Sequence, residues 1–364
     1  MRPSRLSTRM PRMLAVTAVI GCLLAGCAVV GPSALRSGRL AYNDAINETN
    51  NQQMLLVVIY TRYEERGNLL TVASVTANVS VTTEGGIQLG FGDTDNYAGN
   101  LVPFRAISVY EENPTISYIP VAGEKYTRQL MSPLPVKMLA QLAGTVTDPS
   151  HVYTALVADI NGIHNPDFLF SPAVSDPRFT RIVEIMTKLT QAQCLHWVED
   201  PADHRFSIVI HDYPVEHAAM VNELLSLLSL PPLKDPADRL VLPVSLALDG
   251  RDTDGIGIIT RSVYDLGEIL SASIEVPEEQ NQDGITIDYP PVGLAGKDLH
   301  IHYSRKRPEH AYVSVKHRDG WFYIDENDQA TKRFFGLMID LWSVTIAEST
   351  SGTAAPVLTV PVSR

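Results

Sequence analysis

The sequence predicts an α+β protein in which antiparallel sheets pack against helices. Three observations predict this class. Residues 69–121 alternate β-branched and small polar residues between turn-forming residues. Residues 177–192 carry apolar side chains at the spacing of one helix face. Five apolar residues then alternate without a break from Leu240 to Leu248. Helices segregated against antiparallel strands indicate α+β rather than α/β.

The first half of the chain is expected to begin with two helices in residues 34–65, separated at Asn50-Asn51. The apolar run Met54–Tyr60 fits a helix or a buried strand by its period, and its polar surroundings favour the helix. Strands should follow over residues 69–121, including Phe104–Tyr110 and Thr115–Pro120. Short helices are expected next, at Glu124–Leu130, Pro135–Leu142 and Val152–Ile160.

A domain boundary is predicted at residues 165–177, which hold three prolines and few periodic apolar positions. The boundary separates an N-terminal α+β domain, residues 34–165, from a C-terminal α+β domain, residues 178–364. Both domains alternate sheet and helix signals, and no internal repeat of solenoid period is found.

The second half has clearer periodicity. A helix is expected over Pro177–Ala192, a strand over Phe206–Ile210, and a helix after Pro214 that buries Val221, Leu224, Leu225 and Leu228. Pro243 lies within the strand Leu240–Leu248 and favours an edge position, because proline cannot donate to a sheet ladder. A turn at Asp249–Gly255, a short strand and a helix near Arg261–Ala272 should follow. A meander from Leu299 to Ile324, a helix at Asp328–Ile346 and a strand at Val357–Val362 end the chain.

The N-terminus carries the pattern of a secretory signal. Four arginines precede an eleven-residue apolar stretch, Leu14–Leu24, which is too short to span a bilayer. The stretch ends in Leu23-Leu24-Ala25-Gly26-Cys27, which resembles the lipobox of bacterial lipoproteins. The resemblance implies removal of signal peptide 1–26, acylation of Cys27 with fatty acids such as palmitate, and a short tether at residues 27–33. Two or three acyl chains would anchor the protein stably in a membrane.

In this lipoprotein family an aspartate after the cysteine tends to retain the protein in the inner membrane. Here Ala28 follows Cys27, so the resemblance implies the outer membrane, facing the periplasm, in a Gram-negative cell. The body also resembles an uncharacterised group of proteobacterial lipoproteins, at Arg39–Leu56 and in its closing segments Trp321–Asp325 and Pro356–Val362. That group brings no assigned activity, cofactor or partner.

The charge balance and the cysteine content bear on which partners the protein can bind and on whether it can form a disulfide. Without the signal the chain keeps 25 basic against 41 acidic side chains, so its net charge falls from −12 to −16. Such acidity argues against nucleic acid as a partner. Cys22 leaves with the signal and Cys27 is lipidated, so Cys194 is the remaining thiol and an intramolecular disulfide is not expected. A buried Cys194 is favoured over a reactive one.

Histidines in the second half raise a metal hypothesis. His300 and His302 share one face of a predicted strand, and the returning strand would bring His310 or His317 near them. Zinc needs three or four converging ligands, whereas Lys316 and Arg318 place positive charge in the same region. A solvated strand face is favoured, so no metal site and no cofactor are predicted.

Other binding motifs are incomplete. Asp93–Asn96 lacks the glycine and glutamate of an EF-hand loop, and the acidic residues of Asp249–Gly255 fit a turn between strands. The glycines of residues 85–99 lack the GK[ST] of a phosphate loop. The sequence also lacks the G-x-S-x-G nucleophile elbow, the H-E-x-x-H zinc-protease motif, and the S-x-x-K and C-x-x-C motifs. Conceivable acid–base pairs come from His196, His211 and His217 with Asp203 and Asp212, but structural roles for these residues are favoured.

Three function classes remain open. The first, which the sequence favours, is a non-catalytic envelope lipoprotein that scaffolds a complex or binds an envelope protein, for example by strand addition at a sheet edge. The second is a periplasmic enzyme with an unrecognised site. The third is a small-ligand or metal-binding module that uses the segment from His300 to His317.

Overall fold

The structure, a computed structural model, describes residues 40–67, 69–76, 79–86, 105–112, 115–121, 123–165, 176–233, 239–246, 255–289, 295–350 and 358–361. The chain divides into two units, Met1–Met54 and Leu55–Arg364. Each described sheet belongs to the second unit. The protein is α+β, as predicted.

Residues 40–62 form one helix, so the predicted break at Asn50-Asn51 is wrong. Asparagine costs a helix interior less than 1 kcal/mol relative to alanine, which is too little to end a helix whose flanking residues continue it. The apolar run after Gln53 is helical, as predicted, and it buries Leu55, Val58 and Ile59.

Antiparallel pairing in residues 69–121 is confirmed. Strand β1 (Leu69–Thr76) pairs with β4 (Thr115–Val121), and β2 (Val79–Gly86) pairs with β3 (Arg105–Glu112). The last strand, β14 (Leu358–Pro361), adds to the other side of β4, so the C-terminal strand joins a sheet formed near residue 70.

The largest described sheet has six strands in the order β6-β5-β10-β9-β8-β7. Its strands are β5 (Val157–Ile160), β6 (Ile163–His164), β7 (Leu195–Glu199), β8 (Phe206–Ile210), β9 (Leu240–Leu246) and β10 (Ile256–Thr260). Strands β9 and β10 run parallel, and the other pairs are antiparallel. Strands β5 and β6 precede the predicted domain boundary and the other four follow it, so the two predicted domains share this sheet.

Strand β9 lies between β8 and β10, so the edge position predicted from Pro243 is wrong. The sheet tolerates this proline because the ladder between β9 and β10 begins at Val244, one residue later. Gly255 lies against the Pro243 carbonyl, where an added Cβ would be 2.3 Å from the oxygen. The close approach therefore requires glycine at the start of β10.

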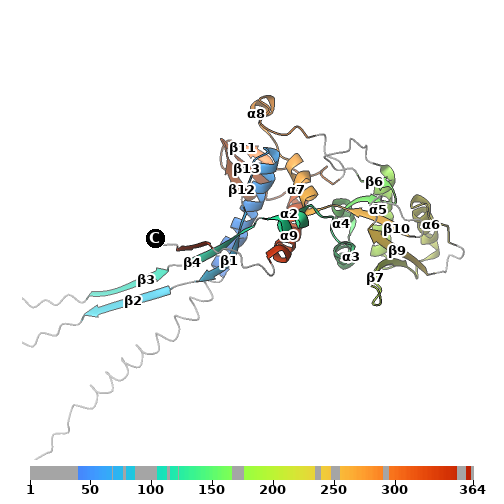
Figure 1. Ribbon diagram of the computed structural model, residues 1–364, viewed down its shortest axis with the longest axis horizontal. Coiled ribbons are helices and arrows are strands. Elements are labelled where there is room, and N and C mark those ends of the chain that lie inside the picture. The colour runs from blue at the N-terminus through green and yellow to red at the C-terminus, as the bar shows by residue number, and fades with distance from the viewer. Residues whose placement is uncertain are drawn as a thin grey trace, which may run out of the picture. The chain divides into compact units, whose positions relative to one another are not determined.

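Most of the remaining helices match those predicted from the sequence. The helices are α2 (Glu124–Met131), α3 (Val136–Thr145), α4 (Ser150–Leu156), α5 (Pro177–Gln191), the 3₁₀ turn η1 (Val215–His217), α6 (Ala218–Leu227), α7 (Val263–Ala272), α8 (Glu278–Gln282) and α9 (Gln329–Thr350). Helix α2 packs against α7 and α9, whereas α3 contacts β7, β8 and β9 (Figure 1). Helix α8 was not predicted, and α4 ends earlier than predicted, at Leu156, although a helix to Ile160 was expected.

Buried polar side chains account for the early end of α4. The guanidinium of Arg261 donates to the carbonyls of Thr154 and Ala155 at 2.8 Å, and the Asn165 amide donates to those of Thr154 and Val157 at 2.9 and 2.7 Å. The last carbonyls of a helix lack intrahelical partners. These two residues supply the missing donors, which lets the chain turn into β5.

A second three-stranded sheet has the order β11-β13-β12, with β11 (His302–Ser304), β12 (Ala311–His317) and β13 (Gly320–Asp325). The predicted meander is therefore wrong in its order, because β13 lies between β11 and β12. Strand β13 therefore separates the strand that carries His302 from the strand that carries His317. In the part of the chain that the structure describes, no helix has the length and apolarity needed to cross a membrane.

Candidate functional site

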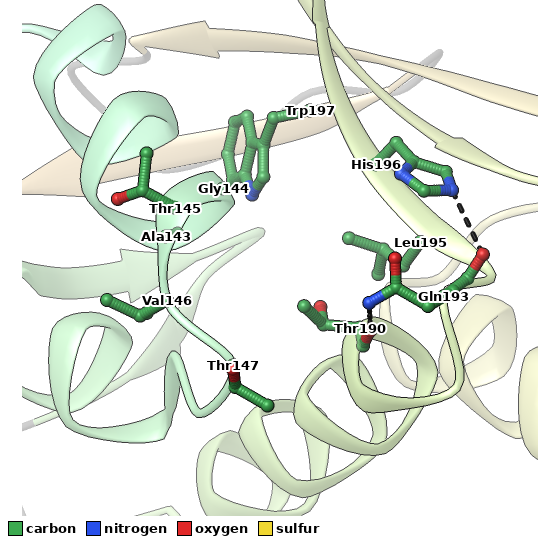
Figure 2. A pocket seen from close by; sticks show the side chains of 10 residues that line it. All are labelled: Ala143, Gly144, Thr145, Val146, Thr147, Thr190, Gln193, Leu195, His196 and Trp197. Carbon is green, nitrogen blue, oxygen red and sulfur yellow. Dashed lines mark hydrogen bonds between the residues drawn. The ribbon is translucent and has the colours of Figure 1, made fainter.

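A small cavity lies beside β7, at one edge of the six-stranded sheet. Its volume is about 220 Å³, and it is bounded by the C-terminal end of α3, the C-terminal end of α5 and the first half of β7. Figure 2 shows the Trp197 ring on the α3 side, near Gly144, and His196 on the α5 side, above Gln193. We name this cavity the β7 cavity.

Two helix ends give the β7 cavity its polarity. Thr145, the last residue of α3, and Thr190, near the end of α5, donate their hydroxyl hydrogens to carbonyls one turn earlier, each at 2.9 Å. The oxygens of both hydroxyls stay able to accept. Both helix ends also carry a partial negative charge, and the last carbonyls of α5 already accept from the backbone N–H groups of Ala192, Gln193 and Cys194. None of the lining residues is Asp, Glu, Lys or Arg. The cavity thus suits a neutral hydrogen-bond donor, such as a peptide N–H.

Trp197 is held by a buried tyrosine. Its indole Nε1 donates to the Tyr153 hydroxyl at 3.0 Å, and burial raises the pKa of Tyr153 well above its usual range. A Cβ added at Gly144 would lie 3.9 Å from the Trp197 Cβ, in ordinary contact. The indole therefore has one fixed orientation, and it closes the inner side of the β7 cavity.

The structure brings together three of the residues predicted as acid–base pairs. The rings of His196 and His211 stack with centroids 5.1 Å apart, and His211 Nδ1 lies 2.7 Å from Asp212 Oδ2. Because a carboxylate accepts, Nδ1 carries the hydrogen, which leaves His211 Nε2 as the basic atom of a neutral ring. His196 Nε2 donates to the Gln193 carbonyl at 3.0 Å. The Asp212 side chain is 91% exposed, so water competes for it and weakens its effect on His211.

The remaining two residues of that prediction lie elsewhere. Asp203 pairs with Arg205, whose backbone and side-chain donors lower the pKa of the carboxyl. His217 has a buried Nδ1 without a hydrogen-bond partner. Neither contributes to the β7 cavity.

The histidines of the metal hypothesis do not converge on one point. His300 and His302 have ring centroids 6.1 Å apart, and His302 Nδ1 lies 2.9 Å from Glu275 Oε1. His317 packs among aromatic rings, with Tyr63 at 5.0 Å and Tyr60 at 5.5 Å. Exposed His310 precedes β12. Throughout the described segments, no three His, Cys, Asp or Glu side chains converge as a metal site would require.

Cys194 is 3% exposed, as its predicted burial requires, and burial raises the pKa of its thiol. Its Sγ lies 3.3 Å from the Ala192 carbonyl. Cys27 and the acidic cluster Asp93–Asn96 lie outside the described residues, as do residues 249–254 of the second acidic cluster.

The β7 cavity itself was missed from the sequence. Its lining comes from residues 143–147 and 190–197, which are distant in the chain, and a threonine at a helix end is too common to mark a site. The sequence carries no local signal that marks this cavity. In comparisons of this chain with known proteins, no family model, curated protein or solved structure matches it.

Proposed function

We propose that this chain is a lipid-anchored, non-catalytic envelope protein that binds a partner protein by adding a partner strand to the edge of β7. The anchor is Cys27, through its lipobox, and Ala28 supports the outer membrane with the body facing the periplasm. The observation that carries the partner-binding role is the open edge of β7.

Strand β7 is the last strand in its sheet, and its first three residues line the β7 cavity. An edge strand presents backbone donors and acceptors that can pair with another chain. Natural proteins commonly protect such edges with lysine, proline or a bulge. Strand β7 reads Leu195-His196-Trp197-Val198-Glu199 and has no lysine, proline or bulge of its own, and its charged end, Glu199, lies 3.9 Å from Lys137 of α3. An extended peptide is therefore the ligand class that fits this edge.

The sheet face beside this edge adds apolar contact area. Val198 is 40% exposed, and its register partners across the sheet are Ser207 and then Pro243. Val241, in the adjacent row of the same face, is 50% exposed. A solvated face of an antiparallel sheet is normally polar. Exposed valines and a proline on this face favour a surface that a partner covers.

The enzyme alternative rests on the His211–Asp212 pair beside His196. This pair is open to water, and a general base acts best in a site that excludes water and holds a substrate near it. Loss of a measured hydrolytic activity in His211→Gln, with partner binding intact, would favour this alternative over the scaffold.

Crosslinking of the native lipoprotein in cells tests the proposal. Val198→Glu and Val241→Glu each place a charge on the proposed surface, and Val344→Glu on α9 is the matched control, since Val344 is 42% exposed. We expect a crosslinked partner with the wild type and with Val344→Glu, and its loss from both sheet variants. Equal crosslinking in all four proteins, or recovery of monomer alone under several conditions, would refute the proposal.

A further inference from the structure

A second cavity, distant in sequence from β7, lies where the start of α4, the start of α9 and residues 295–299 meet. Its volume is about 280 Å³. The floor is apolar and includes Leu299, Phe334 and Leu337, of which Leu299 and Phe334 are buried. We name it the α4–α9 cavity. Its size is at the lower limit for small-molecule sites, so the ligand it suits is small.

Arg333 is the cationic side chain of this cavity, and it forms no ion pair with the described residues. Two carboxylates lie in its neighbourhood: Asp298, which lines the same cavity, and Asp148, whose carboxyl the charge of Arg333 reaches. Asp148 already accepts from the Ser150 backbone N–H at 3.0 Å and from the Ser150 hydroxyl at 2.5 Å. Those bonds lower the pKa of Asp148, to which the charges of His151 and Arg333 add. The Arg333 guanidinium therefore keeps donors for another anion.

The other polar side chains of the α4–α9 cavity add little positive charge. Burial and the charge of Arg333 lower the pKa of His151, so its ring is neutral at pH 7. The Thr154 hydroxyl donates to the Ser150 carbonyl at 2.8 Å. Asp298 also lines the cavity and opposes an anionic ligand. Arg333 is thus the group able to hold a negatively charged head, above an apolar floor.

We propose that the α4–α9 cavity binds a small amphiphilic carboxylate, with its head on Arg333 and a short hydrocarbon chain over Leu299, Phe334 and Leu337. A planar guanidinium matches a carboxylate in a bidentate pair, which is stronger than a neutral hydrogen bond. The apolar floor supplies the hydrophobic contribution of the chain. This ligand site does not depend on the partner-binding role proposed for β7.

Equilibrium dialysis of radiolabelled octanoate against the full chain tests the proposal, with the same detergent on both sides of the membrane. Arg333→Gln should weaken binding by up to about 5-fold, because an ion pair on an exposed side chain contributes at most roughly 1 kcal/mol. The matched control is Arg305→Gln, an exposed arginine on the β11–β12 turn, which should leave binding unchanged. Asp298→Asn should tighten binding, since it removes a repelling charge.

Chain length provides a second measurement. Each methylene contributes about 0.8 kcal/mol, or about fourfold in affinity, so hexanoate should bind roughly 15-fold more weakly than octanoate. Circular dichroism melting confirms that each variant folds. If Arg333→Gln is unfolded, Arg333→Lys replaces it and should keep part of the affinity. Absence of saturable octanoate binding at millimolar concentration, or equal binding by the Arg333 and Arg305 variants, overturns the proposal.

Discussion

Replacement of Arg261 is expected to destabilise the protein more than replacement of an exposed arginine. Its side chain is 2% exposed and makes three hydrogen bonds of 2.8 Å, to the carbonyls of Thr154, Ala155 and Asn165. These contacts join the end of α4, the segment after β6 and the segment between β10 and α7. The substitution Arg261→Met keeps an unbranched apolar stem and removes every side-chain donor.

The expected loss of stability comes from the carbonyl groups that stay buried after Arg261 is replaced. A buried acceptor left without a donor typically costs about 1–3 kcal/mol. The carbonyls of Ala155 and Asn165 lose their Arg261 donor, whereas the Thr154 carbonyl keeps the Asn165 amide. The expected loss is therefore about 2–6 kcal/mol. Whole-domain stabilities are about 5–15 kcal/mol, so this loss is a large fraction. With a urea dependence of about 3 kcal/mol per molar, the unfolding midpoint should fall by roughly 1 M or more.

Urea unfolding followed by far-ultraviolet circular dichroism measures this change, with Arg305→Met as the matched control. Exposed substitutions usually stay within about 0.5 kcal/mol, so the control should keep the wild-type midpoint. Arg261→Lys should lie between the two, because an ammonium keeps the charge but cannot span three carbonyls. A midpoint for Arg261→Met equal to that of Arg305→Met would refute the assigned role of this network.

Three further predictions concern single residues. Gly255→Ala should lower the melting temperature, because its Cβ would meet the Pro243 carbonyl oxygen at 2.3 Å, whereas Gly336→Ala in α9, with nothing within 4 Å, should raise it slightly. Cys194 should react with a thiol reagent in denaturant but not in the native protein, since it is buried and its thiol pKa is raised; rapid native labelling would contradict this. Burial lowers the pKa of His317 below its ordinary value near 6.5, so the unfolded chain binds the proton more readily and stability should fall as pH drops from about 6.5 toward the folded pKa. Unfolding free energies measured between pH 5 and 8 should depend less on pH in His317→Gln, and an unchanged slope would argue against this assignment.

Local patterns were sufficient for the elements whose partners are near in sequence. Helix α5 and strand β8 carry their period in their own side chains, and burial of Phe179, Ile182 and Val183 follows from spacing alone. Strand β7 was not predicted. The resemblance of Leu23–Cys27 to a lipobox is likewise local, because five consecutive residues carry it. Candidate sites were harder to predict: His196, His211 and Asp212 were named from proximity, whereas the threonines at the ends of α3 and α5 carried no such signal.

What the sequence by itself determined was the α+β class, the antiparallel pairing after residue 69 and the identity of most helices, because period and turn residues are local properties. The tertiary structure alone decided where α4 ends, where β9 lies and which strands border β13. Arg261 reaches α4 from more than 100 residues away, and Pro243 is tolerated inside a sheet because the ladder to β10 starts one residue later. Such outcomes depend on which distant group satisfies a buried carbonyl or fills a position in a sheet, and periodicity within one segment does not contain that information.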